Sequence, residues 1–229
     1  MKRVAAAVAF ATASACAHAG RPLSTEDAST LGDKACQLEA WGDRSRDETR
    51  AGAVPTCNFG WGIEWQAGFA RARVDGESAF SESYLQGKKV LVEPAEGGAG
   101  FGIVAGFARF VRRETHRGYE DPYALMPITW MPSAATTFHA NLGWTRDRHA
   151  KSDSMVWGIA GEHAITPRVT LVAEAFGTDR DRPFGRIGAR VNAAKGLDFD
   201  FTVVGRSGGS GADRYLSIGL TWAPSPFLP

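Results

Sequence analysis

Apolar and polar residues alternate one by one along much of the chain. From Trp61 to Phe69 the odd positions carry Trp, Ile, Trp, Ala and Phe, whereas the even positions carry Gly, Glu, Gln and Gly. Because successive side chains of a β-strand point to opposite faces, this segment is predicted to be a strand with one apolar face and one polar or small face. The same pattern recurs in residues 138–145, 197–206 and 215–222.

A weaker form of this alternation fills the intervening sequence, and helical periodicity is hard to find. The chain holds 27 glycines, which fits short strands joined by turns. The sequence therefore predicts an all-β fold. The weaker candidate strands are residues 83–92, 100–111, 122–131, 154–164, 168–177 and 184–193.

Two architectures produce such alternation, and they differ in where the apolar face points. A soluble barrel or sandwich turns it inward, whereas a membrane barrel turns it toward lipid and keeps a polar lumen. The polar face here is rich in glycine and in charges of both signs, and Trp and Phe lie near strand ends, as in an interfacial girdle. We therefore predict a transmembrane β-barrel. The expected lumen-lining side chains are Glu39, Glu64, Gln66, Lys88, His139, Asn141, Glu162, Glu174, Arg186, Arg190, Asp198, Asp200 and Arg206.

The first nineteen residues read as a cleavable signal peptide. A positive start at Lys2 and Arg3 precedes a short apolar run over residues 4–15, and Ala17-His18-Ala19 gives the cleavage pattern before Gly20. The alternatives are a buried N-terminal helix and lipoprotein processing at Cys16. An exported chain is then expected to comprise a periplasmic N-terminal segment (20–35), the barrel (36–222) and a C-terminal tail (223–229).

The strand count follows from the turns. An outer-membrane barrel begins and ends in the periplasm with an even number of strands, so the strand at Trp61 must ascend and two strands must precede it. Residues 36–44 and 49–57 supply them, which gives about twelve strands in a single antiparallel up-and-down barrel. In this register Cys36 lies directly opposite Cys57, within reach of a disulfide. The alternative is two free thiols.

Charge and motifs exclude several classes of function. Removal of residues 1–19 leaves 24 basic and 25 acidic residues, so there is no electrostatic footprint for nucleic acid. His139 is the best candidate for catalysis, but its face of the strand offers Asn141 and no serine nucleophile. The other mature histidines lack metal-ligand spacing. The sequence thus predicts no enzyme, metal or cofactor.

Several segments also carry a family resemblance. They are residues 21–28, 36–41, 138–144, 173–177, 215–222 and 223–229. On these segments the chain resembles a family of uncharacterised proteobacterial outer-membrane barrels and is similar to the transporter-like barrels named for a phenol-degradation (MetA) pathway. The resemblance covers nearly the whole mature chain and implies a barrel fold more firmly than a function. Ser217, Gly219 and Trp222 also resemble the final-strand signal read by the barrel-insertion machinery, although seven residues follow Trp222.

Three hypotheses for function follow. The first is an outer-membrane channel or transport-type barrel for a small solute. The second is a non-conducting structural barrel that contacts outer-membrane lipid or lipopolysaccharide, and the third is a soluble periplasmic barrel that binds an apolar ligand. The lumen charges fit a selective path or ion pairs that brace the wall, and residues 20–35 offer a segment that would fold back inside.

Overall fold

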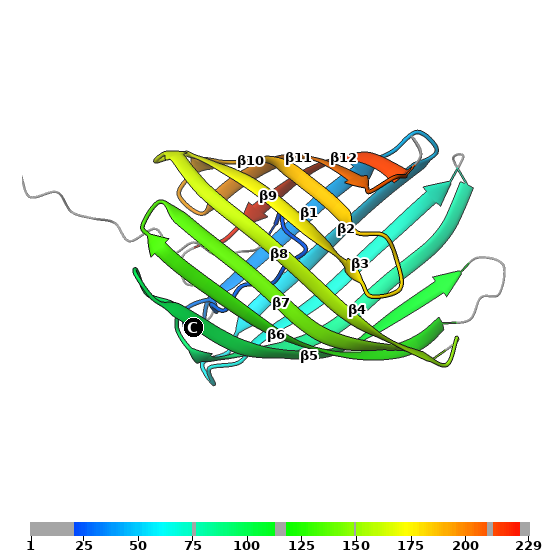
Figure 1. Ribbon diagram of the computed structural model, residues 1–229, viewed down its shortest axis with the longest axis horizontal. Helices are drawn as coiled ribbons and strands as arrows, with labels where there is room; N and C mark the ends of the chain where they lie inside the picture. Colours follow the sequence, from blue (N-terminus) through cyan, green and yellow to red (C-terminus); the bar gives the residue numbers. More distant parts are fainter. Residues whose placement is uncertain (1–20, 75–76, 113–117, 149, 210–212, 225–229) are drawn as a thin grey trace, which may run out of the picture.

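The computed structural model describes residues 21–74, 77–112, 118–148, 150–209 and 213–224. Within them the chain forms twelve strands and closes into one barrel (Figure 1). The strands are β1 (Cys36–Arg44), β2 (Glu48–Asn58), β3 (Glu64–Val74), β4 (Glu77–Val92), β5 (Ala99–Arg112), β6 (Gly118–Ser133), β7 (Thr136–Asp147), β8 (Ser152–Thr166), β9 (Val169–Thr178), β10 (Phe184–Ala194), β11 (Leu197–Arg206) and β12 (Arg214–Trp222).

Each strand pairs antiparallel with its neighbours in sequence, and β1 pairs antiparallel with β12 to close the ring. Closure leaves none of the twelve described strands at an open edge of the sheet. The predicted all-β, up-and-down barrel of twelve strands is thereby confirmed. We call the end where β1 begins and β12 ends the base, and the opposite end the mouth.

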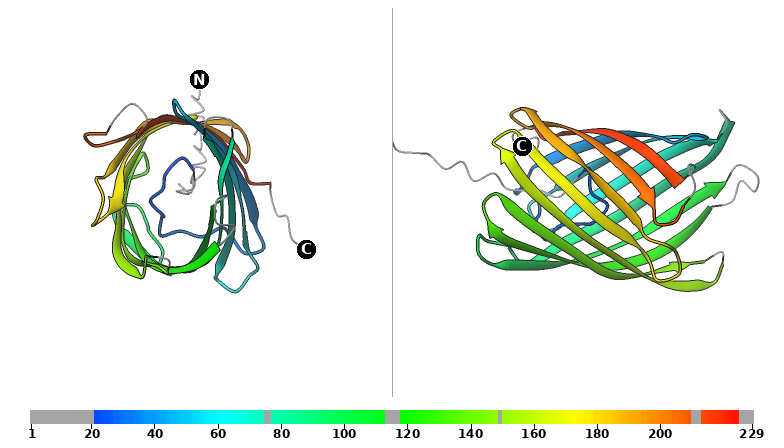
Figure 2. Two further views of the ribbon diagram at one scale, coloured as in Figure 1. Left: turned by 90° about the vertical axis from the view of Figure 1, so that its right-hand side faces the viewer. Right: turned by 45° about the horizontal axis from the view of Figure 1, so that its top comes forward.

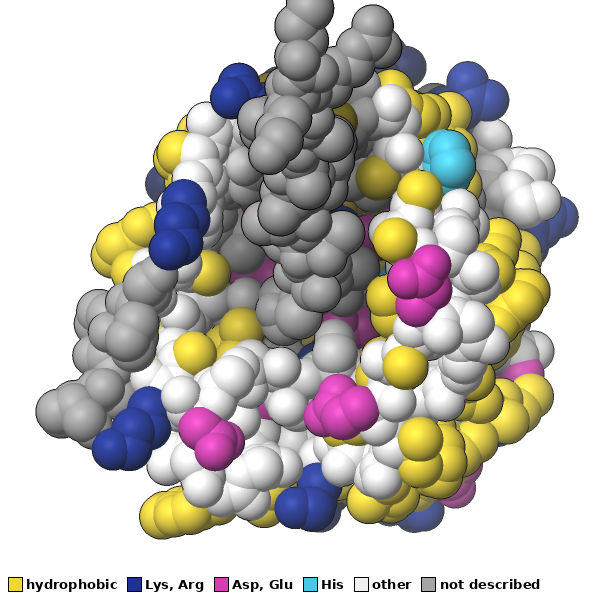
Figure 3. Space-filling model, turned by 90° about the vertical axis from the view of Figure 1, so that its left-hand side faces the viewer, with side chains coloured by type: hydrophobic (Ala, Val, Ile, Leu, Met, Phe, Trp, Pro, Cys, Tyr) yellow, Lys and Arg dark blue, Asp and Glu magenta, His cyan; other side chains and the backbone are white. Residues whose placement is uncertain are grey.

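The alternation in sequence becomes a wall with two unlike faces. On β11, Phe199, Phe201 and Val203 point outward and are well exposed, whereas Asp200 and Thr202 point inward and are buried. Figure 3 shows apolar side chains gathered on the outer flank of the wall. This arrangement of faces is that of a membrane barrel, because its apolar band would be unfavourable in water. The alternative of a soluble barrel with an apolar interior is therefore wrong.

The strands differ from the predicted ones mainly at the mouth. The predicted strand 61–69 is wrong at its start, because β3 begins at Glu64 and continues to Val74. Strands β4 and β6 also begin several residues earlier than predicted, at Glu77 and Gly118. Near the mouth the outward side chains become polar, so the apolar alternation ends before the backbone ladder does.

No helix long and apolar enough to cross a membrane occurs within the described ranges.

Candidate functional site

The interior of the barrel holds the residues predicted to line a lumen. Ten of the thirteen are buried, while Arg190, Asp198 and Arg206 are partly exposed. These side chains converge from strands around the whole ring because every second residue of each strand points inward. Most of them do not face open space, since a segment of the chain itself lies between them.

Residues 21–35 run inside the barrel before the chain enters β1. Viewed along the barrel in Figure 2 (left), this N-terminal segment lies within the ring of strands. Its residues Thr25, Asp27 and Ala28 are almost fully buried. Residues 21–35 thus lie in the lumen. This agrees with the suggestion from the sequence that the segment folds back inside the barrel.

Arg21 joins the N-terminal segment to the seam where the barrel closes. Its guanidinium donates to Asp200 on β11 at 3.0 Å and to Ser217 on β12 at 2.7 Å. Its backbone N–H donates to Glu39 on β1 at 3.1 Å. The guanidinium also lies 5.2 Å from the centre of a ring of Trp41. One residue therefore contacts three consecutive strands of the closed ring.

Glu174 on β9 binds the next turn of the segment. One of its carboxylate oxygens accepts hydrogen bonds from the Ser24 N–H at 2.8 Å, the Thr25 N–H at 2.5 Å and the Thr25 hydroxyl at 2.6 Å. Its other oxygen lies 3.2 Å from the Arg186 guanidinium, which also donates to the Pro22 carbonyl. A buried carboxylate with this many donors is well compensated for the loss of water.

Lys88 on β4 is the centre of a buried ionic cluster. Its ammonium lies 2.9 Å from Asp27, 3.1 Å from Glu64 and 3.5 Å from Glu26. Burial raises the pKa of Glu26, against the opposing effect of Lys88. Burial acts in the same direction on Asp27, but the Lys88 ammonium and hydrogen bonds outweigh it and hold the pKa of Asp27 below its usual value. Asp27 is therefore ionised while it is seated against Lys88.

The candidate catalytic histidine supports the same segment. The Thr129 hydroxyl accepts from the Ala28 N–H at 2.8 Å and lies 2.9 Å from His139 Nδ1. The Asn141 amide, with its oxygen toward the Glu26 N–H, accepts from it at 2.6 Å. His139 thus contacts a threonine that already holds the backbone of the segment. His139 therefore lies next to the N-terminal segment and contacts it through Thr129.

Four further predicted lumen residues, Glu162, Arg190, Asp198 and Arg206, make contacts on β8, β10 and β11. Arg190 pairs with Glu162 and also donates to the Arg21 carbonyl at 3.3 Å. Asp198 accepts from the Asn192 amide at 2.7 Å, and Arg206 lies over the Phe184 ring at 4.7 Å. The contacts of Asp198 and Arg206 connect the neighbouring strands β10 and β11, whereas the pair of Arg190 and Glu162 links β10 to β8 past β9. All three brace the wall.

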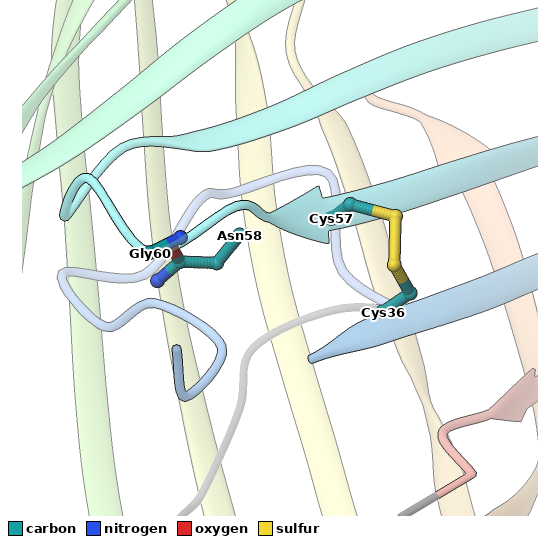
Figure 4. Close-up of a disulfide and its surroundings, with 4 residues drawn as sticks. All are labelled: Cys36, Cys57, Asn58 and Gly60. Atoms are coloured by element: carbon teal, nitrogen blue, oxygen red, sulfur yellow. A yellow bond between two sulfur atoms is a disulfide. The ribbon is translucent and has the colours of Figure 1, made fainter. Parts of the chain in front are cut away.

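At the base, the segment is tied down by a disulfide and a buried amide. Cys36 and Cys57 are paired in register and bonded, with their Cα atoms 4.1 Å apart (Figure 4). The Asn58 amide donates to the Leu31 carbonyl at 2.7 Å, and the Leu31 N–H donates to Glu64 at 2.8 Å. The predicted disulfide and its register are confirmed.

Two glycines of the wall, Gly158 and Gly219, provide space for the N-terminal segment because they have no side chain. A Cβ atom on Gly158 would lie 2.5 Å from the Thr25 hydroxyl oxygen. A Cβ atom on Gly219 would lie 2.3 Å from Arg21 Nε and 2.6 Å from an Asp200 oxygen. Gly219 was singled out with Ser217 and Trp222 as part of an assembly signal, a role that stays a prediction. In the folded barrel Ser217 and Gly219 receive Arg21, whereas Trp222 is exposed on the strand's other face.

The segment does not fill the lumen. A cavity of about 320 Å³ lies between it and the inner wall, lined by Glu39, Tyr84 and other polar residues. A second cavity of about 330 Å³ lies toward the mouth and includes Glu48 and Asp213 in its lining. The residues that line both cavities are Asp43, Arg50, Phe176 and Tyr215.

Sequence reasoning missed the half of this site that the N-terminal segment supplies. Arg21, Thr25 and Asp27 lie in a short stretch without period-two alternation, so no pattern marked them as buried. Trp41 was placed in β1 without a role, although its odd position in the strand put it on the face of Glu39. No group of three or more His, Cys, Asp or Glu suited to a metal occurs among the described residues.

The fold and its occupied lumen define a porin-like barrel of twelve strands. A family profile matches residues 5–223, and the chain therefore belongs to the family described as "Uncharacterised conserved protein UCP029691". No curated protein matches the sequence. The predicted similarity to barrels of a phenol-degradation pathway is not confirmed by this match.

Solved structures of outer-membrane barrels share the fold. The KdgM porin superposes with a TM-score of 0.62 at 8% identity, covering 81% of this chain and 98% of its own. The NanC porin gives 0.61 at 6% identity, with 82% and 98% covered. The COG4313 outer membrane channel from Pseudomonas putida F1 gives 0.61 at 8% identity, with 86% and 98% covered. At such low identity these similarities establish the fold alone.

Proposed function

We propose that this protein is an outer-membrane channel-type barrel for a small polar solute, whose lumen is narrowed by its own N-terminal segment. The observation that carries the proposal is the pair of polar cavities that meet at Asp43, Arg50, Phe176 and Tyr215. Together they lead from the mouth to the segment along the inner wall. A barrel that served only as a rigid support would gain more from a filled interior.

The apolar outer wall supports placement in the outer membrane, with the base toward the periplasm by the parity of the strands. The barrels with the same fold are porins and an outer membrane channel, which supports the same class. One KdgM structure holds a disordered oligogalacturonate. We do not expect the same solute in this barrel. The charged residues lining the two cavities include seven carboxylates and only four basic side chains.

A non-conducting structural barrel is the second candidate, and the contacts of the N-terminal segment favour it. Arg21, Thr25 and Asp27 are each held by lumen side chains at hydrogen-bonding distance. If the segment never moves, the inner cavity ends against it. The phenol-pathway resemblance belongs with the channel proposal, since it concerns transporter-like barrels.

Planar-bilayer recording separates the two candidates. The mature chain is compared with a variant in which Arg21, Thr25 and Asp27 are replaced by alanine, and heat-modifiable gel migration verifies that both are folded. We expect discrete conductance from the natural chain and a larger one from the variant. Folded barrels that stay silent in both forms would overturn the channel proposal in favour of the structural one.

A further inference from the structure

The outer wall carries a cluster of arginines at the mouth of β1 to β5. On β3, Ala72 is fully buried and points inward, so Arg71 and Arg73 on either side of it point outward, and both are exposed. Arg44 on β1 and Arg109 on β5 also lie on the outward face and are exposed. We call these four side chains the arginine patch.

The strand register brings the patch together. Thr49 on β2 is paired with Arg44 on one side and with Arg73 on the other, so the three form one row across β1, β2 and β3. One row deeper, Arg71 is paired with Ser81 on β4. In the next row Ser83 on β4 is paired with Arg109. Hydroxyl groups therefore alternate with guanidinium groups over five adjacent strands.

The outward side chains described on β1 to β5 carry a single sign of charge at the mouth. Among the outward side chains described on β1 to β5, there are four arginines at the mouth and no Asp or Glu. The acidic residues of these strands that the structure describes, such as Asp43, Glu48 and Glu82, are on the inward face, two of them lining the cavities. The nearest acidic position in register is Glu120 on β6, opposite Arg109. The described outward face of β1 to β5 is thus positive at the mouth, and Glu120 on β6 marks its border beside Arg109.

Directly toward the base, the same face becomes apolar. Phe69 shares the row of Ser83, and the next row pairs Leu85 with Phe107. These three side chains are all more than half exposed, at 57%, 53% and 55%. Positive charge next to exposed aromatic and aliphatic side chains complements an amphiphile with an anionic head and acyl chains. In a barrel with its mouth outward, the patch lies at the level of the outer-leaflet head groups.

We infer that the arginine patch is a binding site for the phosphate groups of lipopolysaccharide, with the acyl chains lying along Phe69, Leu85 and Phe107. Arginine suits this role because its planar guanidinium donates two parallel hydrogen bonds to a phosphate. The hydroxyls of Thr49, Ser81 and Ser83 add neutral donors between the cations. The inference rests on the proposed placement in the outer membrane but not on conduction.

The test measures binding of rough-type lipopolysaccharide to the purified, detergent-solubilised barrel. Arg71, Arg73 and Arg109 are replaced by glutamine, and we expect binding about 100-fold weaker, since each charge near an anionic lipid surface contributes about fivefold. The matched control replaces Arg146, Arg180 and Arg182, which also lie at the mouth but on β7 and in the connection between β9 and β10, away from the patch. The control removes the same charge, and we expect its affinity to stay within about threefold of that of the natural chain.

Two further measurements define the ligand. The natural chain should bind dephosphorylated lipopolysaccharide about as weakly as the glutamine variant binds the intact lipid. Lysine at the same three positions should retain most of the affinity, which excludes misfolding as the cause of the loss. Equal loss in the patch and control variants, or equally tight binding to phosphatidylglycerol vesicles, would overturn the inference. The binding assay does not measure conductance. A barrel that binds the lipid but stays silent in the bilayer recording would therefore refute the channel proposal and leave this inference standing.

Discussion

Asp27 of the N-terminal segment lies 2.9 Å from the ammonium of Lys88, 61 residues later on the barrel wall. The contact is buried on both sides and is shared with Glu26 and Glu64. It joins a segment without regular structure to a strand that spans the wall. The position of Glu26 and Asp27 therefore depends on the charge of one lysine.

Replacement of Lys88 by methionine should destabilise the barrel and release the segment. The change leaves two buried carboxylates, Asp27 and Glu64, and the partly buried Glu26 without their shared cation. Loss of one partner of a buried pair costs about 3–5 kcal/mol. Urea-dependent loss of heat-modifiable migration measures the effect. The neighbouring Lys89 is exposed, and Lys89→Met is the control, for which we expect a change below about 0.5 kcal/mol. Equal behaviour of the two variants would refute the role given to Lys88.

A side chain at position 158 should displace Thr25 from Glu174. Gly158→Val places atoms where the Thr25 hydroxyl lies, and backbone on the barrel wall has little freedom to yield. We expect faster proteolysis of the N-terminal segment from the mouth side and a larger bilayer conductance. Gly185→Val is the control, because the nearest atom to a Cβ there is 4.0 Å away. An unchanged cleavage rate in Gly158→Val would show that the segment is not held by this contact.

The disulfide should stabilise the base of the barrel. It closes a stretch of 21 residues, for which the loss of unfolded-state entropy corresponds to about 3 kcal/mol. Replacing Cys36 and Cys57 together by serine should lower the free energy of unfolding by up to that amount. Mass spectrometry of the purified mature chain before and after reduction verifies the bond. A chain that gains no hydrogens on reduction would contradict the pairing.

The open channel should prefer cations. Asp43 lines both cavities, and Glu48 lines the one at the mouth, whereas Arg50 there is paired with Glu82. Fixed carboxylates along a narrow path favour cations. Reversal potentials in a potassium chloride gradient should therefore show potassium more permeant than chloride, and Asp43→Asn with Glu48→Gln should reduce the ratio severalfold. Asp153→Asn, on an exposed hairpin outside these cavities, is the control and should leave the ratio unchanged.

The sequence predicted the wall well because lipid and lumen impose opposite demands on alternate residues. The inward positions of Glu64, Glu174 and Asp200 follow from that period alone. The extra length of β3 and β4 at the mouth could not be predicted from this period. Arg71 and Ser81 lie beyond the apolar band, so they end the apolar alternation while the backbone pairing continues.

The contacts that hold the N-terminal segment in the lumen were beyond sequence reasoning for a different reason. The N-terminal segment is held by single contacts to distant strands, such as Thr25 with Glu174 at a separation of 149 residues. Short segments with such contacts carry no local period. The lumen charges were recognised, but their partners were sought on the wall, whereas Arg21, Glu26 and Asp27 supply several of them.

Arg21 has a consequence for the order in which the molecule is assembled. Its partners Glu39, Asp200 and Ser217 lie on β1, β11 and β12, which come together only when the ring is sealed. Arg21 can therefore form all of these contacts only after β12 has joined β1. The full set of Arg21 contacts therefore distinguishes a closed barrel from one in which β1 and β12 are not yet paired.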